Sequence, residues 1–268
     1  MVQPLSPFPA LTKAAVLAVC VTVLPVPAAF ALPAINDDNR VVHQDFLETR
    51  KTLVDIIHAV RKEYDIPGIS LTVTRGQNHI WAEGFGFADL ENRVPATAHT
   101  VYRAGSLAKP LTAIAIMQLA EKGIIDIDQT VTAYLTDFTI KSRFDTTKEP
   151  ITLRNILCHH SGLPTDLNKG KWSHQDFRGV ASKLGEEFAA YPPNMVFSYS
   201  NIGFSLLGHI IEIVQPLAYS EYMQTQIFQP AGMKNTTLAA QLQQDCAKGY
   251  NNGNEQTLLP IRDVPAYG

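Results

Sequence analysis

The segment "YRAGSLAKPLTAIAIMQLAEKG", residues 102–123, has the pattern of a turn followed by a helix. Pro110 falls within the first helical turn, where a missing N–H group costs little, and Gly123 is typical of a helix C-cap. The residues between them are apolar on nearly every face, which predicts a helix in the middle of a domain. A central helix would place its N-terminal Ser106 and Lys109 at the floor of a cleft.

Ser106 and Lys109 have the chemistry and the spacing of a nucleophile and its electrostatic partner. A serine hydroxyl reacts only when one neighbouring group removes its proton and another stabilises the charge that develops. A helix N-terminus offers N–H groups to Ser106, and Lys109, three residues further on, projects from the same face. The pattern S-x-x-K is short, however, and an ordinary N-cap serine fits it equally well.

A second polar element is "YSN", residues 199–201. A tyrosine hydroxyl takes up a proton only where a nearby cation favours the phenolate, and Lys109 can supply that charge. The amide of Asn201 can bond a substrate amide and hold Lys109. The alternative is that Tyr199 is a core residue and Asn201 caps a helix.

Strands come early in the chain and helices follow. Apolar residues at helical spacing predict an amphipathic helix over residues 45–64. The stretches "ISLTVTRG" (69–76) and "QNHIWAEGFGFADL" (77–90) have the pattern of two strands in a hairpin around Gly76. Further helices are expected within 102–123, 124–135, 151–164 and 197–214. This order predicts an α+β fold in which a helical domain is inserted after the first hairpin of a sheet.

Together these elements resemble the superfamily of serine β-lactamases and penicillin-binding proteins, whose nucleophile motif is S-x-x-K. The similarity is greatest to the branch of class C β-lactamases, esterases, D-aminopeptidases and D,D-carboxypeptidases. It runs in order from about residue 50 to the end of the chain. The segments that carry it are "IPGISLTVTRG", "WAEGFGFADLE", "TVYRAGSLAKPLTA", "GIIDIDQTVTAYL", "ITLRNILCHHSGLP", "FSYSNIGFSLLGHIIE" and "IFQPAGMKNTT". The resemblance implies a β-lactamase/transpeptidase-like fold, with an antiparallel sheet flanked by helices and an inserted, mainly helical domain.

The resemblance also implies a role for each candidate site residue. Ser106 is the acylated nucleophile, and its backbone N–H forms half of an oxyanion hole. Lys109 orients Ser106, Tyr199 is the proton shuttle, and Asn201 contacts the substrate and Lys109. No cofactor and no metal are implied. The expected substrate is a β-lactam, a D-amino-acid peptide or a small ester.

The sequence departs from the family pattern at three points. Pro-Pro-Asn (192–194) stands where the family usually has Pro-Gly, and Gln215-Pro216 stands where a Gly often ends the helix. The third departure is that a Lys or His followed by a small residue and Gly, on a strand facing the nucleophile, is not found downstream of Asn201. Lys248-Gly249 matches a different part of the pattern. We therefore expect an incomplete domain that lacks its C-terminal strands and closing helix, with low activity and marginal stability.

Two alternatives to an active enzyme stay open. The first is a catalytically impaired, truncated scaffold or a binding protein of the same fold. The second sets the resemblance aside and takes the chain as an exported interaction protein with an incidental S-x-x-K.

The N-terminus has the pattern of a secretory signal peptide. Lys13 precedes the apolar stretch "AAVLAVCVTVLPVPAAFA", which ends in small residues at Ala29 and Ala31. This pattern predicts a signal peptide at 1–31 with cleavage after Ala31, and a periplasmic or secreted protein with no stable membrane span. A membrane anchor is the alternative, and lipidation at Cys20 is a minor one.

The mature part of the chain divides into two segments by pattern, and the second has two parts. Residues 32–44 are expected to form a flexible leader, and residues 45–268 an incomplete hydrolase domain. Within that domain, 45–100 would hold the helix and the first hairpin, and 101–268 the mainly helical part with the catalytic motifs.

Composition narrows the range of partners. The net charge is −3, with 46% hydrophobic and 18% charged residues, which argues against nucleic-acid binding and favours a small-molecule or peptide substrate. Oligomeric state stays open, as does a disulfide between Cys158 and Cys246. His159 and His160 are adjacent, and adjacent residues seldom chelate one ion, so a structural role is expected for them.

Overall fold

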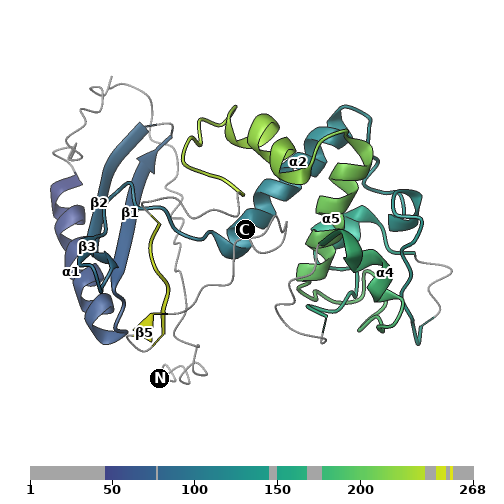
Figure 1. Cartoon of the computed structure of the whole chain (residues 1–268), viewed down its shortest axis with the longest axis horizontal. Helices are drawn as coiled ribbons and strands as arrows, with labels where there is room; N and C mark the ends of the chain where they lie inside the picture. Colours follow the sequence, from purple (N-terminus) through teal and green to yellow (C-terminus); the bar gives the residue numbers. More distant parts are fainter. Residues whose placement is uncertain are drawn as a thin grey trace, which may run out of the picture. The chain divides into compact units, whose positions relative to one another are not determined.

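The chain folds into two units, which Figure 1 draws in sequence colours. The computed structural model describes residues 46–76, 78–144, 150–167, 177–238, 246–251 and 254–255. The first unit comprises Met1–Tyr102 and Gln243–Leu258, and the second Arg103–Leu242 and Leu259–Gly268. The expected signal peptide and leader lie outside the described residues.

The first unit is built on the predicted hairpin. Strand β1 (Gly68–Arg75) pairs antiparallel with β2 (Asn78–Asp89), in a register that runs from Gly68 opposite Gly86 to Arg75 opposite Asn78. A two-residue strand, β3 (Val94–Pro95), adds to the other side of β2, so the sheet has the order β1-β2-β3. Strand β3 was not predicted, because two residues are too few to show an alternating pattern.

Helix α1 (Leu47–Glu63) lies along one face of this sheet (Figure 1). The ring of Phe46, just before the helix, lies 6.1 Å from that of Trp81, and the ring of His58 lies 5.7 Å from that of Phe85. Trp81 is only 1% exposed, whereas no residue of α1 is fully buried. The predicted amphipathic helix is therefore confirmed, and it covers the sheet with a half-buried stripe.

Residues 246–250 return to the first unit, although the sequence placed them with the helical part. Ala247 N donates to the carbonyl of Val101, and Lys248 N donates to the carbonyl of Ala88. The ammonium of Lys248 pairs with Asp89 at 3.2 Å. Backbone hydrogen bonds between distant segments leave no local sequence signal. For this reason the sequence assigned all of residues 101–268 to the helical part, whereas Gln243–Leu258 belong to the first unit. A short hairpin of β4 (Tyr250–Asn251) and β5 (Asn254–Glu255) follows.

The second unit is mainly helical and centres on two helices of fourteen residues, α2 (Ala108–Glu121) and α5 (Asn201–Val214). Its apolar core includes Ile116 and Leu119 of α2 and Leu206 and Leu207 of α5, each at most 1% exposed. The shorter helical segments are η2 (Gly105–Leu107), η3 (Val131–Ala133), α3 (Leu153–Leu157), η4 (Phe177–Gly179), α4 (Val180–Leu184), α6 (Tyr219–Tyr222) and the π-helical turn η5 (Met223–Phe228).

Helix α2 begins and ends as predicted, but it is not buried on every face. Ala115, Ile116 and Leu119 pack into the core of the second unit. Ile114 and Met117, on another face, are 47% and 48% exposed. The expectation of a helix in the middle of its domain was wrong, because an apolar sequence shows what a helix can bury and not which neighbours surround it.

Helix α5 has more buried residues than any other helix described in this unit. Nine of its residues are buried, and Ser200 caps its N-terminus by accepting a hydrogen bond from Gly203 N. Among the helices that the structure describes, none alone is long and apolar enough to cross a bilayer. The segments Asn201–Val214 and Tyr219–Phe228 meet that test only as a pair, with a bend of 83° between them.

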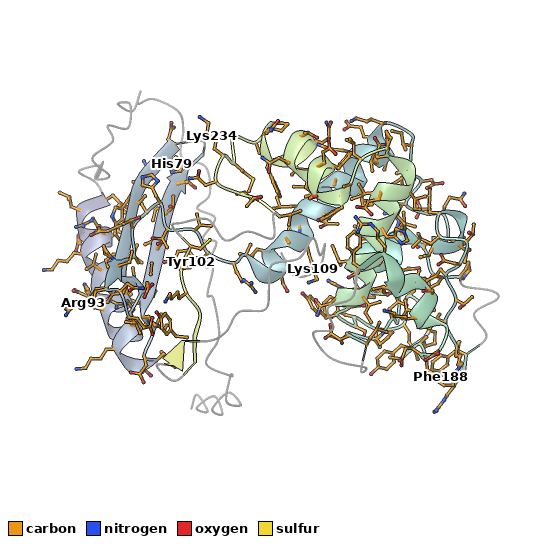
Figure 2. The ribbon with its side chains drawn as sticks, viewed as in Figure 1. His79, Arg93, Tyr102, Lys109, Phe188 and Lys234 are labelled. Atoms are coloured by element: carbon orange, nitrogen blue, oxygen red, sulfur yellow. The ribbon has the colours of Figure 1, made fainter. Side chains whose placement is uncertain are left out.

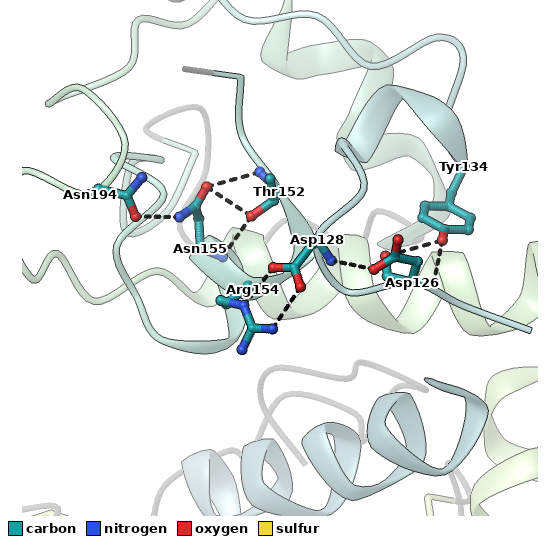
Figure 3. A network of polar contacts seen from close by, with 7 residues as sticks. All are labelled: Asp126, Asp128, Tyr134, Thr152, Arg154, Asn155 and Asn194. Carbon is teal, nitrogen blue, oxygen red and sulfur yellow. Dashed lines mark hydrogen bonds and ion pairs between the residues drawn. The ribbon is translucent and has the colours of Figure 1, made fainter. Parts of the chain in front are cut away.

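A polar network fixes α3 beside the core (Figure 3). Thr152 and Asn155 form a capping box, and Asn155 Nδ2 also donates to Asn194 Oδ1 at 2.7 Å. On the exposed side, Arg154 makes a bidentate pair with Asp128. The network anchors the segment that continues from α3 into residues 158–166, and these residues border the candidate site.

Candidate active site

Ser106 lies on an exposed turn directly before α2. Gly105 adopts a φ of +55°, which favours glycine, and the chain then enters the 3-10 turn η2 that contains Ser106. The serine side chain is exposed, whereas Ala108 and Lys109, the first two residues of α2, are buried. The geometry therefore presents the Ser106 hydroxyl to solvent above a buried lysine.

Lys109, which Figure 2 labels, is the second residue of α2 and is 4% exposed. Lys109 Nζ donates to Ser106 Oγ at 3.2 Å. The same nitrogen lies 4.8 Å from the ring centroid of Tyr199 and 5.8 Å from that of Phe204. Aromatic faces attract a cation, so the two rings stabilise the ammonium where solvent is largely excluded.

Tyr199 completes a three-residue cluster with Ser106 and Lys109. Its hydroxyl lies 2.8 Å from Ser106 Oγ and donates to it. The contact comes from the residues just before α5, so the starts of the two long helices of the second unit meet at the nucleophile candidate. The cluster lies entirely within this unit.

Residues 164 and 165 hold the Tyr199 segment in place. Ser200 Oγ donates to the carbonyl of Pro164 at 2.7 Å, and Thr165 Oγ1 donates to the carbonyl of Tyr199 at 2.9 Å. Asn201 N donates to the carbonyl of Thr165 at 3.0 Å. Each residue of the Tyr-Ser-Asn tripeptide is thus hydrogen-bonded to Pro164 or Thr165, which limits the movement of the Tyr199 hydroxyl.

His159 contributes to the site in a way that the sequence did not show. Its ring lies 4.5 Å from that of Tyr199 and 5.2 Å from that of Phe204, and its Nδ1 accepts a hydrogen bond from Ser200 N. Burial lowers the pKa of His159 below its ordinary value, and the nearby charges of Lys109 and His160 act in the same direction. The imidazole is therefore held neutral, with its proton on Nε2.

Asn201 lies next to the cluster but does not make the hydrogen bond expected of it. Its Nδ2 donates to Asp166 Oδ1 at 3.1 Å. Its Oδ1 is buried and has no hydrogen-bond partner among the described residues, so it does not accept from Lys109. Asp166 is a further residue that the sequence did not indicate, since no spacing pattern links it to a residue 35 positions away.

Two other sequence expectations concern the chemistry of cysteine and metals. Cys158 and Cys246 are both free, so no disulfide joins these two described cysteines. Within the part of the chain that the structure describes, no group of three or more His, Cys, Asp and Glu side chains gathers in a way that could hold a metal ion.

The fold is that of β-lactamases and their penicillin-binding relatives. A class C β-lactamase superposes with a TM-score of 0.68 at 24% identity, over 85% of this chain and 62% of that one. The octameric penicillin-binding protein homologue of Pyrococcus abyssi superposes with a TM-score of 0.66 at 28% identity, over 80% of this chain and 50% of that one. The hydrolase EstCE1, described as having promiscuous acyltransferase activity, superposes with a TM-score of 0.68 at 24% identity, over 81% of this chain and 61% of that one.

The chain belongs to the beta-lactamase family, whose sequence profile matches residues 53–267. Penicillin-binding protein 4* of Bacillus subtilis (strain 168) is 30% identical over 195 residues, which are 70% of this chain and 41% of that protein. Protein flp of Staphylococcus aureus (strain MW2) is 30% identical over 189 residues, 68% of this chain and 36% of that protein. The chain thus spans well under half the length of these two relatives. The predicted family and the β-lactamase/transpeptidase-like fold are confirmed.

Proposed function

We propose that this chain is an exported serine hydrolase that transfers an acyl group through an ester on Ser106. The observation that carries the proposal is the position of Ser106 Oγ, which is exposed and lies within hydrogen-bonding distance of both Lys109 Nζ and Tyr199 OH. A nucleophile beside a proton acceptor and a cation is the arrangement that acyl transfer requires. The substrate class is a β-lactam, a D-amino-acid peptide or a small ester.

In the acylation step, Ser106 Oγ forms a bond to the substrate carbonyl carbon while its proton passes to the oxygen of Tyr199. In the same step Tyr199 passes its own hydroxyl proton to the leaving group as the bond to that group breaks. The Lys109 ammonium, which lies over the tyrosine ring, stabilises the negative charge that develops during these transfers. Water then attacks the ester carbon by the same route in reverse and releases Ser106.

The oxyanion of the tetrahedral intermediate needs hydrogen-bond donors. Ser106 lies in the 3-10 turn η2 that leads into α2, where backbone N–H groups have no intrahelical acceptor, and we assign its N–H as one donor of the oxyanion hole. The positive end of the α2 dipole adds to the same effect.

The comparisons support acyl transfer as a reaction class. Hydrolases, penicillin-binding proteins and a class C β-lactamase share the fold, and EstCE1 is described as a hydrolase with acyltransferase activity. These names do not select one substrate. Export through the signal peptide at 1–31, and a helical part inserted into a helix-flanked sheet, belong to the same proposal.

Intact-mass spectrometry after exposure to benzylpenicillin and, separately, to p-nitrophenyl acetate tests the proposal. We expect a covalent adduct with at least one of them, of the mass of the whole penicillin or of one acetyl group, and no adduct in Ser106→Ala. Ser182→Ala is the matched control, because Ser182 is an exposed serine in the same unit. It should react as the wild type does.

The alternative function, an impaired scaffold or binding protein of the same fold, makes the opposite prediction. A folded wild-type chain that forms no adduct with either reagent would favour it over the hydrolase.

A further inference from the structure

The side-chain amide of Asn201 is satisfied at one end only. Its nitrogen donates to Asp166 Oδ1 at 3.1 Å, while its oxygen is buried and unpaired within the described residues. A buried acceptor without a donor costs free energy of folding. An unpaired atom of this kind beside a candidate active site therefore indicates a role in the reaction. The half-buried carboxylate of Asp166 determines which end of the amide is left over.

The orientation of this amide follows from the chemistry of the carboxylate. An ionised carboxylate only accepts hydrogen bonds, whereas an amide has a donating and an accepting end. If the Asn201 amide were turned around, two oxygen atoms would face each other and repel. Asp166 therefore holds the nitrogen and leaves the oxygen as the vacant acceptor.

The vacant acceptor belongs to the helix face that Lys109 approaches. Asn201 and Phe204 are three positions apart at the start of α5, so their side chains share a face of that helix. Lys109 Nζ lies 5.8 Å from the ring centroid of Phe204 on that face. In the free protein this nitrogen donates to Ser106 Oγ.

We propose that Asp166 is a positioning residue, which clamps the Asn201 amide so that its oxygen can receive the Lys109 ammonium once Ser106 is acylated. An ester oxygen is a much weaker acceptor than a serine hydroxyl, so acylation takes away the hydrogen bond that Lys109 makes to Ser106. The Asn201 oxygen, already held in position, can accept a hydrogen bond from Lys109 in place of the lost one without a rearrangement of the Asn201 side chain. This inference rests on the proposed acylation of Ser106, and it assigns a role to a residue outside the motif.

The first test compares Asp166→Ala with Asp166→Asn in their rate of reaction with a fluorophosphonate, in which Ser106 Oγ bonds to phosphorus and fluoride leaves. Asp166→Ala should react about tenfold more slowly, since hydrogen bonds to charged groups are among the stronger ones. Asp166→Asn should restore most of the rate, because its amide oxygen also accepts from Asn201. Asp137→Ala, which removes an exposed carboxylate of the same unit, should react as the wild type does.

A double-mutant cycle separates positioning from a general structural effect. If Asp166 acts through Asn201, then Asp166→Ala should have no further effect on the rate in an Asn201→Ala background. Equal slowing in both backgrounds, or a wild-type rate for Asp166→Ala, would overturn the proposal.

A third measurement does not depend on reactivity. Hydrogen exchange of the Asn201 side-chain amide, followed by NMR, should be slow in the wild type and in Asp166→Asn and fast in Asp166→Ala. Fast exchange in the wild type would refute the clamp even in a reactive protein. A wild type that fails to react but shows slow exchange would refute the proposed acylation and leave the clamp intact.

Discussion

The hydroxyl of Tyr199 lies 2.8 Å from Oγ of Ser106, although the two residues are 93 positions apart in the chain. The ammonium of Lys109 lies against both, at 3.2 Å from Ser106 Oγ and 4.8 Å from the centre of the tyrosine ring. The second unit therefore brings together the proposed nucleophile, the proposed proton shuttle and a cation from the starts of its two long helices, and each member can be tested separately.

The replacement Tyr199→Phe removes the hydroxyl and keeps the ring that contacts His159 and Lys109. We expect the reaction of Ser106 with a fluorophosphonate to slow by about 10²–10⁴-fold, the usual contribution of a general acid–base group. The matched control is Tyr222→Phe, whose lost hydroxyl is buried and has no hydrogen-bond partner among the described residues. Tyr222→Phe should react normally and be no less stable, whereas an equal rate for both variants would contradict the role of Tyr199.

Replacing Lys109 by Met should separate function from stability. A buried ammonium loses its hydration, and an apolar side chain of similar length does not, so the free energy of unfolding should stay the same or rise. Reaction at Ser106 should fall below detection, because the cation beside the nucleophile is gone. Thermal unfolding and intact mass measure the two effects, and a loss of more than about 1 kcal/mol of stability would instead mark Lys109 as a structural residue.

The lowered pKa of His159 leads us to expect that the stability of the protein depends on pH. Its pKa in the folded protein lies below the ordinary value of 6.5, so the unfolded chain binds the proton more readily. The stabilisation is complete above about pH 6.5 and is lost as the pH falls toward the lowered pKa. Denaturant titrations between about pH 7 and about pH 5 should show a steeper loss for the wild type than for His159→Gln, which has no titrating ring. Parallel curves for the two proteins would refute this prediction.

Two glycines of the second unit, Gly123 and Gly162, should differ in how strongly an alanine substitution destabilises the protein. Gly123 and Gly162 both have φ near +70°, so alanine is strained at either position by about 1 kcal/mol. At Gly123 an added Cβ meets open space, whereas at Gly162 it would lie 1.9 Å from the carbonyl oxygen of Tyr191. Gly162→Ala should therefore cost at least about 2 kcal/mol more than Gly123→Ala in denaturant titrations. Equal costs would show that the segment around Tyr191 moves away freely.

The parts of the fold with a repeating pattern could be predicted from the sequence. The hairpin of β1 and β2, the starts of α2 and α5, and the family all follow from local alternation, capping and motif order. Ser106, Lys109 and Tyr199 were candidates for the same reason, and the structure brings the three together.

What the sequence could not show depends on contacts between distant segments. The pairing of residues 246–248 with Val101 and Ala88 uses backbone groups that every residue has. The contact of His159 with Tyr199 and the bond between Asn201 and Asp166 arise only when the 158–166 segment folds against the start of α5. For the same reason the exposure of Ile114 and Met117 on an apolar helix was not foreseen.

The most direct test of the central claim is tandem mass spectrometry of the peptide that a fluorophosphonate modifies. We predict one phosphonylated residue, Ser106, in the wild-type protein, and no modification in Ser106→Ala or Lys109→Met. Modification of another serine, or an unmodified Ser106 in a folded protein, would contradict it.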